Sequence, residues 1–296
     1  MRAHLLNPIW HSKEKRRLKR NRLLQKRKTL YLQRYVPYML ALDGNPDLDS
    51  ALKDSAEKAF TIWFQGEENA PKIVKRCIES QRLLSPLELV VLNESNIYDW
   101  ISLPDYIVAK YRDGKIGRAH FADICRLELL YRYGGLWMDA TDLIVSPVPD
   151  WIMNESFFVY MAGENILGAY SYIQNCFIRA KKGDRLLKMW RDSVFEYWRR
   201  EERVVDYVIH HLIFKVLVEN NPLARQLFEG MPKHIQDPTH TIWFRLKDKP
   251  FDEEEYRQLS NAACFQKTDY LSDASKNPVP GTYADYIING KINSNG

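Results

Sequence analysis

The chain has 296 residues, of which 45% are hydrophobic and 12% aromatic, and this content suits one catalytic domain with smaller appendages. Its four cysteines lie far apart and include no C-x-x-C pair, which is typical of buried thiols in a reducing compartment and excludes a disulfide-rich fold. No run of about 18 uncharged apolar residues is present and the N-terminus lacks an apolar signal core, so we expect neither a secretion signal nor a membrane span.

Positive charge is concentrated at the N-terminus. Residues 1–35 carry twelve Lys or Arg and a single acid, a net charge of +11, and because the whole chain carries +5 the remainder carries −6. Apolar residues recur at seven-residue spacing within this basic segment, which predicts a helix with a narrow apolar stripe. The stripe consists of Leu23 with Leu30 and Leu24 with Tyr31.

Such a basic helix suits an anionic membrane surface, where each Lys or Arg contributes on the order of 1 kcal/mol. A solvated or self-associating helix is an equally open interpretation. We expect no nucleic-acid binding, because the rest of the sequence offers no base-stacking aromatics with basic neighbours. A loop at residues 43–49 follows, so we place a basic helical arm and linker at residues 1–55 and the catalytic domain at residues 56–296.

The catalytic domain begins with strands that alternate with helices. Residues 60–64 form an apolar, aromatic strand that is followed by Gln65 and Gly66, after which Pro71 opens a helix. Residues 87–92 form a second strand. This alternation predicts an α/β domain with a parallel sheet.

The middle of the chain holds the most informative pattern. Apolar residues at helical spacing predict an amphipathic helix over residues 119–133, with Asp123 and Arg126 three apart near its start. A pair of glycines ends the helix, because the residue after a helix favours a left-handed backbone. The apolar run of residues 136–138 then predicts a buried strand that delivers Asp139 at its end.

The lengths of these two elements predict a site. From Asp123 the helix rises roughly 15 Å and the strand returns roughly 13 Å, so Asp139 comes back level with Asp123 and Arg126. With Asp142, three acids and an arginine then meet where a strand ends, the usual place for ligands in open α/β sheets. Clustered carboxylates suit Mg²⁺ or Mn²⁺, which predicts a divalent ion that bridges the protein to a diphosphate. A turn whose acids only cap the strand end is the alternative.

Further elements are predicted towards the C-terminus. Residues 157–161 and 172–179 read as strands, and residues 184–200 as a helix with a strong apolar pattern. Asp206 and His210 are four apart, which predicts one helical face and a spacing that suits a metal or an acceptor hydroxyl. A structural histidine is the alternative for His210.

The order D-x-x-R, helix, Y-G-G and an apolar strand ending in acids resembles glycosyltransferase family 32. The segments AHFADICRL and YGGLWMDAT are most similar to bacterial capsular polysaccharide synthesis proteins, and the large clostridial glucosylating toxins have a similar spacing. The resemblance implies a GT-A fold, with a mixed, mostly parallel sheet flanked by helices, a nucleotide-diphosphate sugar as donor, and Mn²⁺ or Mg²⁺. Thr141 replaces the second acid of the motif, so the alternatives for the metal ligand are Asp139, Asp142, or Asp139 with help from the diphosphate.

The resemblance also implies roles for single residues. The candidate catalytic residues are Asp139, Arg126 and Asp123, with Asp123 either orienting Arg126 or binding a donor hydroxyl. The residues expected to contact the nucleotide sugar are Trp63, Gln65, Gly66, Asp123, Arg126, Asp139, Thr141 and Lys267. The candidate metal ligands are Asp139, Asp142 and His210. An ordinary core aromatic is the alternative for Trp63, and a turn glycine for Gly66.

Together these features predict a metal-dependent glycosyltransferase that moves a sugar to a glycan or lipid-linked glycan acceptor in capsule or surface polysaccharide synthesis. The resemblance implies retention of the anomeric configuration. We expect the enzyme in the cytoplasm, peripheral at the inner face of the cell membrane through its basic arm. A nucleotide-sugar hydrolase and a non-catalytic nucleotide-sugar-binding protein are the alternatives. A haloacid-dehalogenase-like phosphatase is disfavoured, because Thr141 stands where that class needs a second Asp.

Overall fold

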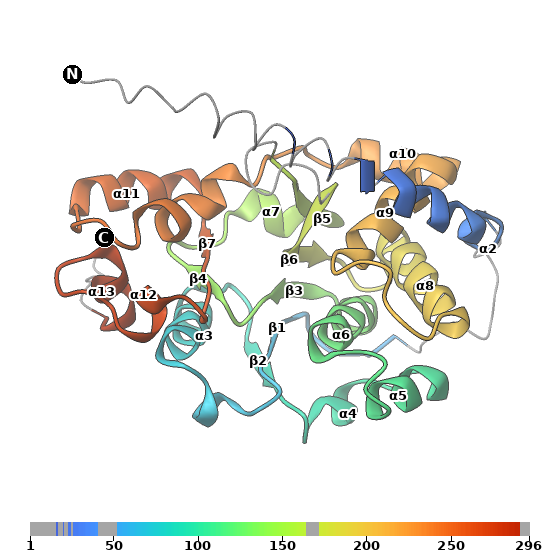
Figure 1. Ribbon diagram of the computed structural model, residues 1–296, viewed down its shortest axis with the longest axis horizontal. Coiled ribbons are helices and arrows are strands. Elements are labelled where there is room, and N and C mark those ends of the chain that lie inside the picture. Colours follow the sequence, from blue (N-terminus) through green and yellow to red (C-terminus); the bar gives the residue numbers. More distant parts are fainter. Residues whose placement is uncertain are drawn as a thin grey trace.

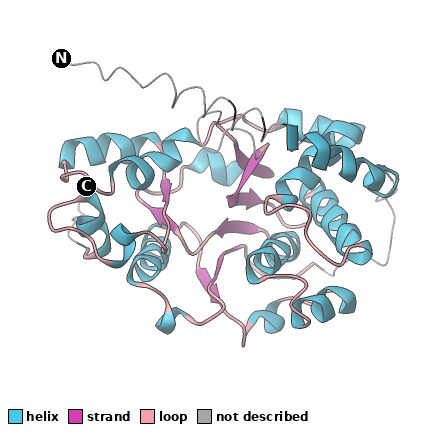
Figure 2. Cartoon of the chain, viewed as in Figure 1, coloured by secondary structure: helices cyan, strands magenta, loops and turns pink. Residues whose placement is uncertain are grey.

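A computed structural model shows a five-stranded sheet with helices on both sides (Figure 1, Figure 2). It describes residues 16, 20, 23, 24, 26–40, 52–163 and 172–290. The strands are β1 Lys58–Ile62, β2 Leu89–Leu92, β3 Gly135–Met138, β4 Asp142–Ile144, β5 Phe157–Met161, β6 Ile173–Ala180 and β7 Phe265–Lys267. The helices are α2 Val36–Leu40, α3 Lys72–Leu84, α4 Ile97–Trp100, α5 Asp105–Arg112, α6 Arg118–Tyr133, α7 Asp150–Asn154, α8 Arg185–Arg200, α9 Ile209–Asn220, α10 Pro222–Gly230, α11 Glu253–Ala262, α12 Asp273–Lys276 and α13 Tyr283–Ile288.

The main sheet has the strand order β2-β1-β3-β6-β5. β1 pairs in parallel with β2 and β3, whereas β6 runs antiparallel between β3 and β5. Four of these five strands therefore point the same way, with β6 reversed. The predicted α/β class, with a mixed and mostly parallel sheet flanked by helices, is confirmed.

The elements predicted from periodicity are present, with ends that differ by a few residues. The first strand, predicted at residues 60–64, is β1 at Lys58–Ile62, so Trp63 lies just beyond its end. The predicted central helix is α6, and the helix predicted at residues 184–200 is α8, whose first turn is capped by the Asp184 side chain accepting from Leu187 N at 2.9 Å. Every residue of β3 is buried, as expected for a central strand with both faces covered.

The glycine pair ends α6 and starts β3, as predicted. Gly134 has φ +70° and Gly135 has φ +112°, values that L side chains rarely adopt. A Cβ on Gly135 would lie 1.8 Å from Lys58 O, so only glycine lets β3 start this close to β1. The two glycines therefore allow the chain to leave the helix and enter the centre of the sheet at once.

A second, two-stranded sheet lies beside the first (Figure 1). β4 follows the Asp139 turn and pairs antiparallel with β7, with Asp142 opposite Lys267 in the register. No local sequence pattern indicates this pairing, because β7 comes from the C-terminal part of the chain. The pairing places Lys267 next to the acids that follow β3.

The basic arm is described only in part. Residues 26–32 are helical, and within the predicted stripe Leu23 is 55% exposed and Leu30 is 61% exposed. The following residues join the main core, where Tyr35 packs against Tyr197 of α8 at 5.6 Å and Met39 O accepts a hydrogen bond from Asn221 Nδ2 at 3.0 Å. The loop predicted at residues 43–49 lies outside the described residues, and the division at residue 55 stays a prediction. In the described part of the chain, no helix has both the length and the apolar character that crossing a bilayer requires.

Candidate active site

Helix α6 and strand β3 bring their charged residues together as their lengths predict. Arg126 Nη2 lies 2.7 Å from Asp123 Oδ1 and 3.1 Å from Asp139 Oδ1. Trp137 Nε1 donates to the same Asp139 oxygen at 2.8 Å. Arg126 is buried and its guanidinium lies 4.9 Å from the Trp137 ring centroid, so its charge is fixed in place below the end of β3.

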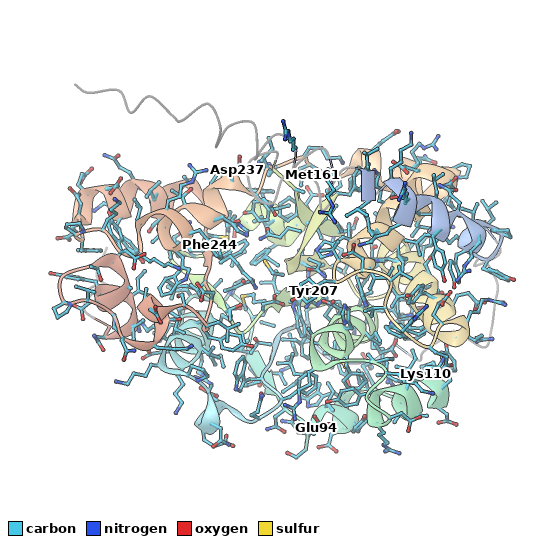
Figure 3. All side chains as sticks on the ribbon, in the orientation of Figure 1. Glu94, Lys110, Met161, Tyr207, Asp237 and Phe244 are labelled. Carbon is cyan, nitrogen blue, oxygen red and sulfur yellow. The ribbon has the colours of Figure 1, made fainter. Side chains whose placement is uncertain are left out.

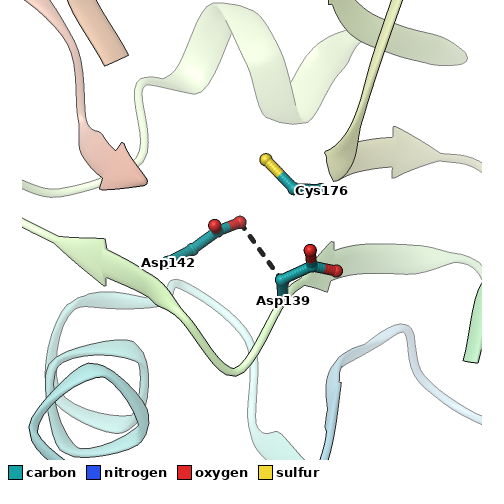
Figure 4. A group of neighbouring side chains, drawn as sticks. All are labelled: Asp139, Asp142 and Cys176. Atoms are coloured by element: carbon teal, nitrogen blue, oxygen red, sulfur yellow. Dashed lines mark hydrogen bonds between the residues drawn. The ribbon is translucent and has the colours of Figure 1, made fainter. Parts of the chain in front are cut away.

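A lysine lies between the two acids of the turn. Lys267 Nζ is 2.7 Å from Asp139 Oδ2 and 3.1 Å from Asp142 Oδ1. The Asp142 side chain is fully buried, and its Oδ2 accepts from Asp139 N at 3.2 Å (Figure 4). The β4–β7 pairing holds this lysine in position, because Asp142 and Lys267 face each other in the ladder.

The turn between β3 and β4 is fixed through its backbone. Asp142 N donates to Asp139 O at 2.8 Å, and Gln81 Nε2 of α3 donates to the carbonyls of both residues at 2.8 Å each. Thr141 O accepts from both the backbone N and the hydroxyl of Thr268 at 2.8 Å. Thr141 thus anchors the strand that carries the lysine, and its expected contact with the nucleotide sugar stays a prediction.

Two residues of β6 complete the site and were missed by the sequence reasoning. Asn175 Nδ2 donates to Asp123 Oδ1 at 3.1 Å, and Asn175 O accepts from Arg126 Nη1. Cys176 O accepts from Asp139 N at 2.9 Å, and its Sγ belongs with Asp139 and Asp142 to a group of potential ligand atoms within 4.8 Å of one another (Figure 4). Asn175 and Cys176 reach the site only through the antiparallel register of β6 on β3, and no local sequence pattern indicates that register.

The pKa values of the two turn acids, Asp139 and Asp142, are shifted in opposite directions. Burial opposes the ionised form of Asp139, but the charges of Lys267 and Arg126 outweigh it and lower the pKa of that carboxyl. For Asp142, burial and the neighbouring Asp139 charge outweigh the attraction of Lys267 and raise the pKa to about 7. Asp139 and Asp142 together raise the pKa of the Lys267 ammonium despite its burial. Lys267 is therefore charged at neutral pH, while Asp142 titrates there.

The residues present fit a divalent cation. Asp142 Oδ1 is buried and has no hydrogen-bond partner among the described residues, although the Lys267 ammonium lies near it. Asp139 Oδ2 faces the same ammonium. Two carboxylate oxygens held this way suit Mn²⁺ or Mg²⁺, and the Cys176 thiol adds a softer potential ligand.

The predicted nucleotide-sugar residues after β1 lie at the same edge of the sheet, one strand away from β3. Trp63 packs edge-on against Tyr270 with ring centroids 5.2 Å apart, and its buried Nε1 lacks a hydrogen-bond partner among the described residues. Gln65 is exposed. Gly66 has φ +86°, a backbone conformation that L side chains rarely adopt, so the turn favours glycine at this position. The binding roles of all three stay predictions.

The predicted helical pairing of Asp206 with His210 is wrong. α9 begins at Ile209, and Asp206 lies before it, where its carboxylate pairs with Lys28 and accepts from Val208 N at 3.0 Å. An acid that bonds the backbone two residues on favours a turn over a helix, which explains the difference.

His210 lies outside the group formed by the two turn acids and Cys176. Its buried ring stacks on His120 of α6 at 6.2 Å, and burial lowers its pKa well below the ordinary value. Its role as a metal ligand stays a prediction. Burial lowers the pKa of His211 to about 4, and the charge of Asp123 partly offsets this effect. Tyr207, in the loop before α9, is 74% exposed and its backbone O lies 3.1 Å from His120 Nε2 (Figure 3).

Comparisons with known proteins agree on one class. A family model described as capsular polysaccharide synthesis protein matches residues 14–287. An O-glycosyltransferase of Annulohypoxylon truncatum is 28% identical over 176 residues, which cover 54% of this chain and 42% of that protein. An O-glycosyltransferase of Phomopsis amygdali is 27% identical over 164 residues, which cover 49% of this chain and 39% of that protein.

The matched region spans less than half the length of either curated relative. A solved structure of the PaToxG glycosyltransferase covers 93% of this chain and 98% of that chain, with 14% identity and a TM-score of 0.38, a likeness too distant to argue from.

Proposed function

Because the chain belongs to the capsular polysaccharide synthesis protein family, we propose that it is a glycosyltransferase that moves a sugar from a nucleotide-diphosphate sugar to a glycan or lipid-linked glycan acceptor of a surface polysaccharide. One observation carries this proposal. At the carboxyl end of β3, Asp139 lies between two cations, Arg126 at 3.1 Å and Lys267 at 2.7 Å, with the buried Asp142 beside it. Such an edge is where α/β sheets bind nucleotides.

The charges at this edge suit the chemistry of sugar transfer. Cleavage of the bond between sugar and diphosphate leaves negative charge on the diphosphate and positive charge at the anomeric carbon, so fixed cations at the phosphates stabilise the transition state. Arg126 and Lys267 supply such cations from α6 and β7. A divalent ion held by Asp139 and Asp142 would add a Lewis acid that neutralises the leaving group.

The contacts of Asp123 support an orienting role. Its Oδ1 accepts from Asn175 Nδ2 at 3.1 Å and pairs with Arg126 at 2.7 Å, so it holds the guanidinium plane towards Asp139. A planar guanidinium fixed by an acid on one side presents its remaining N–H groups in a set direction. We propose that Asp123 positions Arg126 and that Arg126 binds the donor sugar nucleotide. We also propose retention of the anomeric configuration, which the ¹H coupling constant of a purified product would test.

The exposed stripe of the arm supports a membrane partner. Leu23 and Leu30 stay in solvent although they are large and apolar, and Arg20, Lys26 and Arg27 nearby are exposed as well, whereas Lys28 is partly buried and pairs with Asp206. Apolar and basic side chains together on one helix suit the boundary between anionic headgroups and acyl chains. We propose that the arm holds the enzyme at the inner face of the cell membrane, where lipid-linked glycan acceptors would be reached.

Ligand-dependent stability tests the proposal directly. A ligand that binds the folded state raises the melting temperature by mass action. We expect a nucleotide diphosphate with Mn²⁺ to raise the melting temperature of the parent, and Asp139→Asn to remove that rise. If no nucleotide diphosphate among UDP, GDP, ADP, CDP and dTDP shifts the melting temperature with either Mn²⁺ or Mg²⁺, the proposal is wrong.

A nucleotide-sugar hydrolase would bind the same ligands, so binding alone does not separate the two functions. The discriminating measurement is release of nucleotide diphosphate from a bound donor with and without acceptor glycans. A transferase releases it mainly when an acceptor is present, whereas a hydrolase releases it at the same rate with water alone.

A further inference from the structure

Asp139 and Asp142 form an acid pair, and the side chain of Lys267 already contacts the two oxygens that a metal ion would bind. Asp139 Oδ1 accepts from Trp137 and pairs with Arg126, and Asp142 Oδ2 accepts from Asp139 N. The other two oxygens, Asp139 Oδ2 and Asp142 Oδ1, both face the ammonium of Lys267 at 2.7 and 3.1 Å. An ammonium and a divalent cation therefore compete for one position.

The surroundings of Lys267 make this competition strong. The acids are largely or fully buried, and low local polarity strengthens every charge interaction among them. A divalent ion that bound while the ammonium remained would lie close to both Lys267 and Arg126. The ion and the two side chains would then carry four positive charges, against three negative charges on Asp123, Asp139 and Asp142. The ion can therefore bind the acid pair only if the lysine ammonium leaves it.

The backbone permits that exit without unfolding the site. Thr268, the next residue, is fixed to Thr141 O through both its N–H and its hydroxyl at 2.8 Å, and β7 stays paired with β4. Lys267 carries a flexible four-carbon stem and a side chain that is 20% exposed, so rotation of the side chain alone is enough to carry the ammonium away from the acids.

We propose that Lys267 is the resident counter-ion of the Asp139–Asp142 pair, and that a divalent ion and a diphosphate enter together by displacing its ammonium, which then pairs with the diphosphate. The proposal rests on the function proposed above. It makes metal and diphosphate binding strongly cooperative, because the ion pairs that Lys267 forms within the described residues are with Asp139 and Asp142, and the ion alone would break both without supplying another anion. When the diphosphate is present, its negative charge compensates the displaced ammonium of Lys267.

Binding calorimetry on the full chain tests the exchange, with Mn²⁺ alone and Mn²⁺ with inorganic pyrophosphate as probes. Lys267→Met removes the competing charge, so we expect Mn²⁺ alone to bind this variant at least tenfold more tightly than the parent. In the parent, pyrophosphate should tighten Mn²⁺ binding at least tenfold, and in Lys267→Met it should tighten it much less.

Lys247→Met is the matched control. The Lys247 side chain is also 20% exposed and pairs with an acid, Asp269, at 3.3 Å, but it does not contact the acid pair. We expect this variant to bind both probes like the parent. A gain in Mn²⁺ affinity in both variants would reflect a general change in charge and would overturn the proposal.

The outcomes separate this inference from the proposed function. If the parent binds Mn²⁺ with pyrophosphate, UDP or GDP but Lys267→Met binds Mn²⁺ alone no more tightly than the parent does, the counter-ion role is wrong and the proposed function stands. If neither protein binds any of these probes, both are wrong. Should Lys267→Met fold only when Mn²⁺ is present, the ion replaces the lysine charge as proposed. Failure of Mn²⁺ to restore either Lys267→Met or Lys267→Gln would overturn it.

Discussion

Replacing Asp142 by Asn is expected to leave the fold at least as stable as the parent at pH 8, although it removes a proposed metal ligand. Asp142 is fully buried, and its pKa is about 7 against an ordinary 3.8. At about 1.4 kcal/mol for each pKa unit, ionising Asp142 costs the folded state roughly 4 kcal/mol more than it costs the unfolded chain. Asn resembles the protonated acid in shape, so the variant avoids this cost.

The sign of the effect gives it a pH signature. Because the folded pKa is raised, the protonated form of Asp142 stabilises the fold fully below about pH 4, and that stability is lost as the pH rises to about 7. Asn does not titrate. The unfolding free energy of the variant minus that of the parent should therefore be near zero at pH 4 and grow to at most about 4 kcal/mol above pH 7.

Urea unfolding in EDTA between pH 4 and 8 measures this difference. Asp139→Asn is the control with the opposite sign, because the pKa of Asp139 is lowered and its loss leaves Arg126 and Lys267 without their shared partner. We expect that control to lose about 3–5 kcal/mol at pH 8, as buried pairs do when one partner is removed. An Asp142→Asn variant that is less stable than the parent at pH 8, or a difference that does not grow between pH 4 and 7, would refute the reasoning.

Three further outcomes are expected. Arg126→Lys keeps the positive charge but loses the planar guanidinium that contacts Asp123. We expect turnover to fall about 10²-fold or more and the unfolding free energy to fall by about 1–3 kcal/mol. Unchanged activity per folded molecule would show that the Asp123–Arg126 pair is structural. Affinity for Mn²⁺ with pyrophosphate should rise with pH up to about 7 and then level off, because binding requires ionised Asp142; calorimetry showing no pH dependence would contradict this. A Leu23→Glu, Leu30→Glu double variant should sediment less with anionic vesicles than the parent, and 1 M salt, which shortens screening to about 3 Å, should weaken the parent too. Equal sedimentation would leave the arm as a self-association segment.

The structure also guides the choice of a surface variant for the vesicle assay. Leu32, Tyr35 and Met39 are buried in the main core, so a truncation near residue 51 would strip core residues together with the arm. Leu23 and Leu30 of the stripe are instead large and solvent-exposed, so we expect charged residues there to leave the packing of the body intact.

The centre of the site follows from the sequence, because its parts are local. Helical and strand periodicity, a glycine pair and two known rises per residue place Asp139 level with Asp123 and Arg126, and the structure brings both acids within 3.1 Å of Arg126. The α/β class follows in the same way from strands that alternate with helices. These predictions need no information about distant contacts.

Tertiary structure alone decided which other groups surround that centre. Lys267 is 128 residues from Asp139, and only the antiparallel pairing of β7 with β4 places its ammonium between the acids. Cys176 arrives on a reversed strand whose register on β3 no local pattern specifies. Asp206 lies before α9 and not within a helix as predicted, because its side chain accepts a hydrogen bond from Val208 N and pairs with Lys28. Periodicity fixes which residues share a face of one element, whereas pairing between elements distant in the chain depends on the packing of the whole core.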